Sequence, residues 1–258
     1  MDEEIYLRAL LAAQELKPQE ERLLVRLKDT VQARLSRLTG SPVFYYAGSF
    51  AKNTIIRERF DLDIVVYWPP DCGYTLRDIY TAVGKVLRAW RLGVTPKTVA
   101  WHVPITAGFY IDVVPGRAVD NTYYYANLYR RPGSWIQTSI KKHIKTVRDS
   151  GRCDVIRLMK LWRVRKRVPI PKSLLLELLT LRGCSGCRFS SLASQMNAAL
   201  EFIRDCIMDA RIEDPANANN IISDEMTRKQ RLVARLHARK ALEARTWNAV
   251  FAPRPATI

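Results

Sequence analysis

The most constraining feature of this chain is a spaced set of acidic residues on apolar segments. Asp61 and Asp63 stand two positions apart at the start of the apolar run 64–67, and Asp112 lies within a second apolar run, 109–114. Successive side chains of a β-strand point to opposite faces, so residues two apart share a face. We therefore expect Asp61 and Asp63 to project together from one strand, with Asp112 on a second strand that pairs beside it.

Three carboxylates that converge in this way are suited to binding divalent cations. Two Mg²⁺ ions about 3.5–4 Å apart bridge the attacking and leaving oxygens of a phosphoryl transfer. Mg²⁺ takes few protein carboxylates and completes its shell with water and substrate phosphates. Asp61, Asp63 and Asp112 thus predict a site for two Mg²⁺ (or Mn²⁺) ions, at which no histidine nucleophile or base is needed.

A Gly-Ser pair precedes the acidic residues. Residues 43–46 are predicted to form a strand and residues 50–56 to start a helix, with Gly48 and Ser49 between them. Glycine lets the backbone approach a ligand closely, and a helix start offers unpaired N–H groups to an anion. Ser49 is suited to capping the helix or donating to a phosphate, and Lys52 adds positive charge. We expect these residues to hold nucleotide phosphates.

Neither motif is specific by itself, because a lone Gly-Ser pair is common and a lone Asp-x-Asp is usually a turn. Their fixed order, with the third acidic residue on a later strand, resembles the polymerase-beta-like nucleotidyltransferases. Within them the chain resembles the cyclic GMP-AMP synthase and oligoadenylate synthetase group, and most of all the bacterial antiphage second-messenger synthases known as CD-NTases. The resemblance covers nearly the whole chain, and its looser motifs lie at 158–162, 174–179 and 214–220.

The resemblance implies an α+β fold, with a mixed-sheet nucleotidyltransferase core, a long N-terminal helix and a C-terminal helical bundle. We expect a catalytic core with the N-terminal helix over residues 1–135 and a helical domain over 136–258. The resemblance also implies roles for single residues. Asp61, Asp63 and Asp112 would bind metal, Gly48 and Ser49 would hold the triphosphate, Lys160 would contact it from the helical half, and Ser173 matches a weaker phosphate-contacting position.

Apolar periodicity and breaking residues predict the elements. Strands are expected at 43–47, 63–68, 98–103 and 108–114, with a helix at 76–90. Helices are expected at 5–13 and 20–38, and then at 136–149, 152–165, 173–182, 189–211 and 225–247. Tyr123–Tyr125 are more typical of a half-buried strand than of a base-stacking platform, because aromatic residues favour pleated surfaces.

The formal charge of +17 is concentrated in the second half of the chain. Residues 141–172 carry a net +10 and residues 225–245 a net +5, whereas residues 1–38 are neutral. The positive electrostatic field of such segments attracts triphosphates or nucleic acid. A run of charged residues can equally be a solvent-exposed face without a ligand. Four arginines near one helical face are the leading candidates for contacts with RNA or an oligonucleotide: Arg228, Arg231, Arg235 and Arg239.

Other sequence features bear on the cellular location of the protein and on whether its cysteines form disulfides or bind zinc. No apolar run approaches the roughly 18 residues of a membrane-spanning helix, and the acidic N-terminus lacks an apolar signal core, so we expect a cytoplasmic protein without a membrane partner. Five cysteines suggest no disulfide framework. Cys184 and Cys187 have zinc-like spacing, but a second close pair of ligands is missing in sequence, which favours a loop with two reduced thiols.

Three functions fit these observations. The leading one is a template-independent nucleotidyltransferase that makes cyclic or linear oligonucleotide second messengers from NTPs in antiphage defence, with a regulatory or effector protein as a partner. The second is a terminal transferase acting on RNA, such as a tRNA 3′ end, which the basic helical half favours. The third is a catalytically silent nucleotide- or RNA-binding module, for which loss of a carboxylate would be the expected mark.

Overall fold

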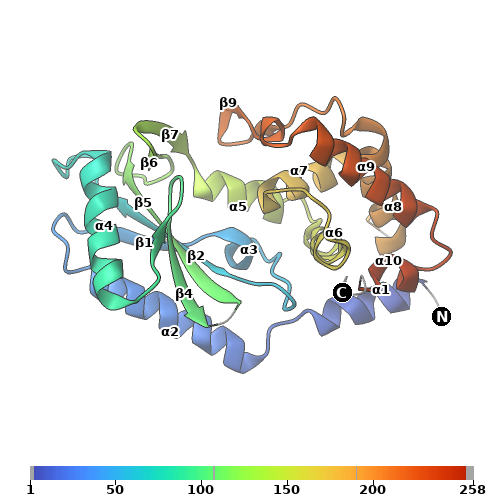
Figure 1. Cartoon of the computed structure of the whole chain (residues 1–258), viewed down its shortest axis with the longest axis horizontal. Helices are drawn as coiled ribbons and strands as arrows, with labels where there is room; N and C mark the ends of the chain where they lie inside the picture. Colours follow the sequence, from blue (N-terminus) through green and yellow to red (C-terminus); the bar gives the residue numbers. More distant parts are fainter. Residues whose placement is uncertain (1–2, 107, 190, 254–258) are drawn as a thin grey trace.

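The computed structural model describes residues 3–106, 108–189 and 191–253. Figure 1 shows two lobes: one is built around a β-sheet flanked by α2 (Pro18–Leu35) and α4 (Leu76–Trp90), and the other consists mainly of helices. In the described part of the chain, no helix combines the length and apolar character that crossing a membrane requires.

The sheet lobe contains a mixed sheet with the strand order β1-β2-β5-β4-β3, extended by β6 on β5 and by β7 on β6. Its strands are β1 (Val43–Tyr46), β2 (Leu62–Trp68), β3 (Thr95–Pro96), β4 (Trp101–Thr106), β5 (Phe109–Ala118), β6 (Ala126–Arg130) and β7 (Ser134–Thr138). Strands β2 and β5 run parallel, and the other pairs are antiparallel. The α+β fold with a mixed sheet is therefore confirmed.

Strand β2 lies inside the sheet, between β1 and β5, and six of its seven residues are buried. The β-branched residues Ile64, Val65 and Val66 suit this position because they pack well on a pleated surface. Helix α4 has the predicted bounds and begins with a capping box, in which Asp78 N donates to Thr75 Oγ1 over 3.1 Å. These well-signalled elements hold the acidic residues on a rigid support.

The helical lobe is arranged around α6 (Cys153–Lys166), in which every residue from Val155 to Trp162 is buried. The other helices are α1 (Glu3–Ala13), α5 (Ile140–Arg148), α7 (Ser173–Gly183), α8 (Leu192–Cys206), α9 (Arg228–Leu242) and α10 (Trp247–Phe251). A short hairpin of β8 (Glu213–Asp214) and β9 (Asn217–Ile221) is followed by the 3-10 helix η1 (Ile222–Glu225). A helix buried on all sides needs partners for its polar side chains, which becomes important at the site below.

The N-terminal helices divide between the two hydrophobic cores. Leu7 and Leu11 of α1 belong to the core of the helical lobe, together with Ile56 from the loop before β2. Leu24 and Val31 of α2 belong to the core of the sheet lobe. The N-terminal region thus spans both lobes, as Figure 1 shows along its lower edge. The domain division at residues 135 and 136 stays a prediction.

Several expected elements differ in the structure. The helix expected at 136–149 starts only after the Ser139 cap, as α5, because residues 136–138 belong to β7, which pairs with β6. Tyr123 has φ +54° and lies in the turn before β6, so Tyr123–Tyr125 do not form a strand. Strand β4 starts at Trp101, later than expected, since Lys97 and Ala100 close a turn through a 2.8 Å backbone hydrogen bond.

Candidate active site

The Gly-Ser turn lies directly against an acidic residue of the neighbouring strand. Gly48 begins a single helical turn, α3 (Gly48–Ala51), which replaces the longer helix start expected over 50–56. Its φ of +58° is in the left-handed region that favours glycine. A Cβ atom at this position would lie only 1.6 Å from Asp63 Oδ2. Gly48 is therefore the residue that lets the turn and the carboxylate share one wall of the site.

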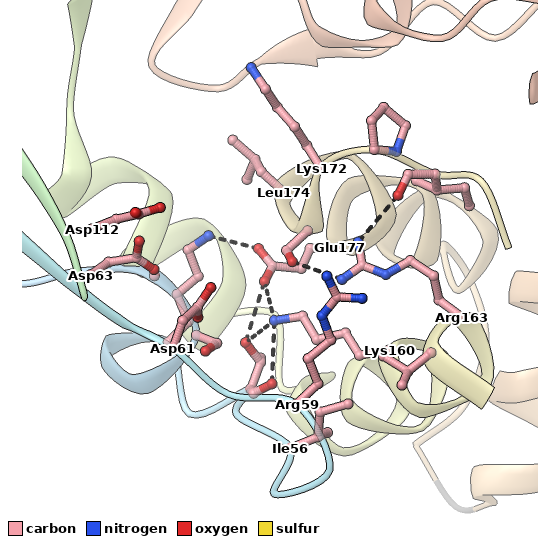
Figure 2. A pocket seen from close by; sticks show the side chains of 18 of the residues that line it. Ile56, Arg59, Asp61, Asp63, Asp112, Lys160, Arg163, Lys172, Leu174 and Glu177 are labelled. Atoms are coloured by element: carbon pink, nitrogen blue, oxygen red, sulfur yellow. Dashed lines mark hydrogen bonds and ion pairs between the residues drawn. The ribbon is translucent and has the colours of Figure 1, made fainter. Parts of the chain in front are cut away.

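The three predicted carboxylates do come together. Strands β2 and β5 run parallel in a register that places Asp63 directly beside Asp112. Asp61 precedes β2 instead of lying within it, and Tyr110 Oη of β5 donates to its Oδ2 over 2.8 Å. Figure 2 shows Asp61, Asp63 and Asp112 on the same side of a pocket. Parallel pairing of two short apolar strands thus produces the acidic cluster that the spacing predicted.

The cluster is electrostatically unfavourable as it stands. Burial, followed by the charges of Asp61 and Asp112, raises the pKa of Asp63 to about 7, although Lys52 and Lys97 act in the opposite direction. A divalent cation among these oxygens would relieve that repulsion, and carboxylate oxygens are the ligands that Mg²⁺ prefers. The donor set therefore fits the metal that the sequence predicted.

Two of the three carboxylates have protein partners in this arrangement. Lys97 forms an ion pair with Asp112, and His102 Nδ1 lies 3.3 Å from Asp112 Oδ1. Among the described residues, no three Asp, Glu, His or Cys side chains are grouped so that they could hold a metal ion as they stand. The Lys97 side chain is 43% exposed, so it is free to leave Asp112 when a cation takes its place.

A cavity of about 750 Å³ opens next to the carboxylates, between the two lobes. Every site residue predicted from the sequence lines it, including Gly48, Ser49 and Ser173. It also contains cationic residues that the sequence analysis did not assign to the site: Arg59, Lys97, Arg163, Arg167 and Lys172. We call this cavity the cationic pocket. Its charge suits a ligand with several negative charges, such as a triphosphate.

Lys52 and Lys160 line the cationic pocket but are also paired inside the protein. Lys52 Nζ lies 2.8 Å from Glu177 Oε2, and Lys160 Nζ lies 2.6 Å from Glu177 Oε1. Burial would raise the pKa of Glu177, but the two ammonium groups outweigh it and hold that pKa at about 2. Sequence reasoning missed Glu177. The signal was an acidic residue inside the leucine run 174–179, since such a residue is rarely buried without a partner.

Ser173 is the first residue of α7, and its hydroxyl has a partner of its own. Arg163 Nη2 donates to Ser173 Oγ over 3.0 Å, and Arg163 Nη1 lies 3.5 Å from the carbonyl oxygen of Ile170. The serine and the arginine both line the cationic pocket. The serine hydroxyl can still donate its own proton, so Ser173 and Arg163 together present donors to an anion.

A second cavity, of about 570 Å³, adjoins the first and shares Asp63 and Asp112 with it. Its wall is partly apolar, with Val99, Val114, Leu128, Ile136 and Ile222. We call it the second pocket. The two cavities are thus joined at the acidic cluster.

The motif at 214–220 forms the polar part of the second pocket's wall. Asp214 Oδ1 lies 2.6 Å from Nε2 of the buried His143. Asp214 also accepts hydrogen bonds from Ala216 N over 2.8 Å and from Asn220 Nδ2 over 3.1 Å. These bonds fold the β8–β9 hairpin against α5, which the sequence analysis did not anticipate.

Much of the basic charge stabilises the fold. Arg165 pairs with Glu58, and Arg152 donates to the carbonyl oxygens of Cys184 and Cys187. Arg231, predicted to lie on an exposed arginine face, donates to carbonyl oxygens of Ile207, Met208, Ala210 and Ser223. Of the four arginines on that helical face, Arg231 is therefore occupied by hydrogen bonds within the protein. A contact with RNA stays a prediction for the other three.

The cysteine pair lies in a loop that Arg152 braces. Cys184 is buried, its Sγ lies 3.4 Å from the carbonyl oxygen of Gln195, and burial raises the pKa of its thiol to about 11. Metal binding requires the thiolate, which this raised pKa disfavours. Among the described residues, neither cysteine belongs to a metal-ligating group of three.

Comparison with known proteins gives a consistent result at the level of structure. No protein-family model matches the sequence, and no curated protein matches it. The structure of CdnC from E. coli MS115-1 in complex with HORMA-deltaN shares 21% identity, covers 97% of each chain and gives a TM-score of 0.76. The Bradyrhizobium diazoefficiens CD-NTase CdnG in complex with GTP shares 15% identity over 94% of this chain and 91% of the other, with a TM-score of 0.78.

A structure of another kind of nucleotidyltransferase is also similar. The Cid1 poly(U) polymerase, solved with Mg and 3′-dATP, shares 13% identity over 97% of this chain and 98% of the other, with a TM-score of 0.73. These identities are low, so the likeness concerns the fold. The chain has the polymerase-beta-like nucleotidyltransferase fold, in the form found in the bacterial CD-NTases.

Proposed function

We propose that this protein is a template-independent nucleotidyltransferase that joins NTPs into cyclic or linear oligonucleotide second messengers. One observation carries the proposal: the cationic pocket and the second pocket meet at Asp63 and Asp112. The first has the charge to hold a triphosphate. The second has the size and the partly apolar wall to hold the nucleoside of an acceptor.

The reaction assigned to this site is an in-line phosphoryl transfer. A ribose 3′- or 2′-hydroxyl oxygen in the second pocket bonds to the α-phosphorus of an NTP in the cationic pocket. The bond between the α-phosphorus and the oxygen that bridges to the β-phosphate breaks, pyrophosphate leaves, and the hydroxyl gives its proton to solvent water. Asp61, Asp63 and Asp112 would hold two Mg²⁺ or Mn²⁺ ions, which supply activation of the hydroxyl and neutralisation of the phosphates when bound.

The chain's own residues position the substrates for this step. Gly48, Ser49 and Ser173 bring backbone and hydroxyl groups to the rim of the cationic pocket, and Lys52 and Lys160 supply charge from below it. In-line transfer gains most of its rate from such positioning and from electrostatic stabilisation. We therefore assign phosphate binding to these five residues.

The similar structures support this proposal through the ligands that they contain. CdnC was solved with ATP, CdnG with GTP, and the Vibrio cholerae DncV cyclic AMP-GMP synthase with the linear intermediate pppA(3′,5′)pG. The CdnC–HORMA-deltaN complex supports a regulatory protein partner, and the role in antiphage defence extends the same likeness. An inactive binding module is less favoured because the three carboxylates converge.

Addition of nucleotides to an RNA end is the second candidate function. The likeness to the Cid1 poly(U) polymerase favours it, and so do the exposed arginines of α9. Arg228, Arg235 and Arg239 are exposed and line neither pocket, so they are the residues that would hold a polynucleotide acceptor.

The first test uses the purified protein with each labelled NTP, singly and in pairs, with Mg²⁺ or Mn²⁺, and with or without tRNA. We expect small oligonucleotides and pyrophosphate from NTPs alone, because both substrates of the proposed reaction fit the two pockets. Products are resolved by mass. Efficient nucleotide addition to tRNA, together with no small oligonucleotide product in the presence of either Mg²⁺ or Mn²⁺, would rule out the preferred function.

The second test changes Arg235 and Arg239 to glutamate together. We expect NTP-only synthesis to stay within about twofold of the unaltered protein, because charge reversal on a solvent-exposed helix face acts weakly at a distance. If the face holds RNA, then RNA binding should weaken steeply with added salt, and the double change should reduce tailing and that salt dependence. Loss of NTP-only synthesis in the double variant would contradict our placement of these arginines outside the site.

A further inference from the structure

A fully buried carboxylate lies beneath the cationic pocket and joins three helices. Glu177 of α7 is 0% exposed, and it forms ion pairs with Lys52 at the end of α3 and Lys160 of α6, which are 5% and 3% exposed. Figure 2 shows Glu177 and Lys160 close together, with dashed lines at the Glu177 carboxylate. The carboxylate therefore connects the phosphate-binding turn to the helical lobe.

Thr54 completes the network. Lys160 Nζ donates to Thr54 Oγ1 over 2.7 Å and lies 3.3 Å from the carbonyl oxygen of Thr54, and Thr54 Oγ1 donates to Glu177 Oε1 over 3.3 Å. Two ammonium groups share one carboxylate, so the network keeps a net positive charge. Because Lys52 and Lys160 both line the cationic pocket, that charge is presented to whatever binds there.

We propose that Glu177 is a positioning residue for the triphosphate, which holds Lys52 and Lys160 fixed and charged beneath it. The inference rests on the proposed function, since it assumes that the cationic pocket receives a triphosphate. It assigns no contact between Glu177 and the nucleotide, because a carboxylate would repel the phosphates. Its role is to keep two buried cations in place while the pocket is empty of anions.

The charges around Lys160 explain why this support is needed. Burial lowers the pKa of Lys160, Glu177 acts in the opposite direction, and Lys52 and Arg163 lower it further. Earlier in the chain, the charges of Asp154 and Arg148 act on the Cys153 thiol, whose pKa is raised mainly by burial. Without Glu177, the ammonium groups of Lys52 and Lys160 would face each other in a low-dielectric site, so Lys160 would lose its proton or the two side chains would move apart.

The experiment measures binding of inorganic tripolyphosphate with Mg²⁺ to the full chain, by calorimetry at pH 7 and pH 9. This probe has no base or ribose, so it reports on the phosphate site alone. We expect the Glu177→Gln variant to bind about tenfold more weakly at pH 7, the range expected for a weakened charge-assisted contact. We expect a further loss at pH 9, because Lys160 deprotonates as the pH rises, whereas the unaltered protein should change much less.

Arg157→Gln provides the matched control. Arg157 is also buried on α6. It ties that helix to α1 through the carbonyl oxygen of Leu11, and it also binds Glu15 and the carbonyl oxygen of Ile55, but it does not line either pocket. We expect this variant to lose thermal stability and to keep tripolyphosphate affinity within about twofold, with an unchanged pH profile. An equal loss of affinity in both variants would reduce Glu177 to a structural residue and overturn the proposal.

The remaining outcomes separate this inference from the proposed function. If the unaltered protein binds no tripolyphosphate, the triphosphate assignment of the pocket fails, and the inference fails with it. If the unaltered protein binds and Glu177→Gln binds equally at both pH values, the inference alone is overturned. Should Glu177→Gln not fold, Glu177→Asp decides: we expect at least about threefold weaker binding, against less than about twofold for Arg157→Lys.

Discussion

Asp63→Asn is expected to reduce NTP turnover by more than about a hundredfold, since even residues that only support a metal ligand contribute 10- to 100-fold. Asp63 is the central member of the acidic cluster, beside Asp112 in the register of β2 and β5. Asparagine keeps its shape but removes the charge that a divalent cation requires. Initial rates of pyrophosphate release with saturating Mg²⁺ provide the measurement.

The same substitution is expected to leave the fold at least as stable as before. Burial and the neighbouring carboxylates disfavour the charge of Asp63, so removing that charge relieves repulsion in the metal-free protein. Thermal unfolding without metal should therefore give an unchanged or higher midpoint. Asp71→Asn, at an exposed acidic residue outside both pockets, serves as the control and should alter neither quantity. Turnover retained by Asp63→Asn would rule out the metal assignment.

Gly48→Ala is expected to damage both activity and stability. The new methyl group would lie 1.6 Å from Asp63 Oδ2 and 2.6 Å from its Cγ, so either the turn or the carboxylate must move. The left-handed φ of +58° adds strain of about 1–3 kcal/mol for a residue with a Cβ. We expect turnover to fall by about a hundredfold, as for other displacements of about 1 Å at a reacting centre.

Gly73→Ala isolates the part of this effect that comes from the site. Gly73 also has a positive φ, +73°, but a Cβ atom there would meet nothing within 4 Å. The two variants therefore share the backbone strain and differ in the clash with Asp63. We expect Gly73→Ala to lower the unfolding midpoint slightly and to keep full turnover. If Gly48→Ala behaves in the same way, the close approach of the turn to the carboxylate has no catalytic consequence.

The site was predictable to the extent that local spacing determines it. Asp63 and Asp112 lie on apolar runs of strand-like composition, and their parallel pairing places them side by side. Helix α4 has the bounds that its periodicity and its Thr75 cap predict. Gly48 was identified through its motif, but its contact with Asp63 depends on the packing of α3 against β2, which a linear sequence does not specify.

The remaining features depend on contacts between distant residues. The helix expected at 136–149 included residues 136–138, which belong to β7 instead. These three residues carry too short a pattern to distinguish the helical from the strand period, and pairing with β6 decides the outcome. Glu177 was seen only as part of a leucine-rich helix, although its partner Lys52 lies 125 residues earlier. Long-range ion pairs of this kind set the geometry of the phosphate site, and local sequence patterns do not predict them.

The position of α1 also affects the order in which the two lobes can fold during translation. Among the described elements, helix α1 is translated first, yet it contacts α6, α8 and α10, which all lie in the second half of the chain. Leu7 and Leu11, both buried in the finished molecule, must therefore stay without their final partners during most of synthesis. Contacts between such distant segments close slowly and leave apolar surface exposed in the meantime. The helical lobe thus becomes complete only after translation of the C-terminal helices, whereas the sheet lobe has all of its strands much earlier.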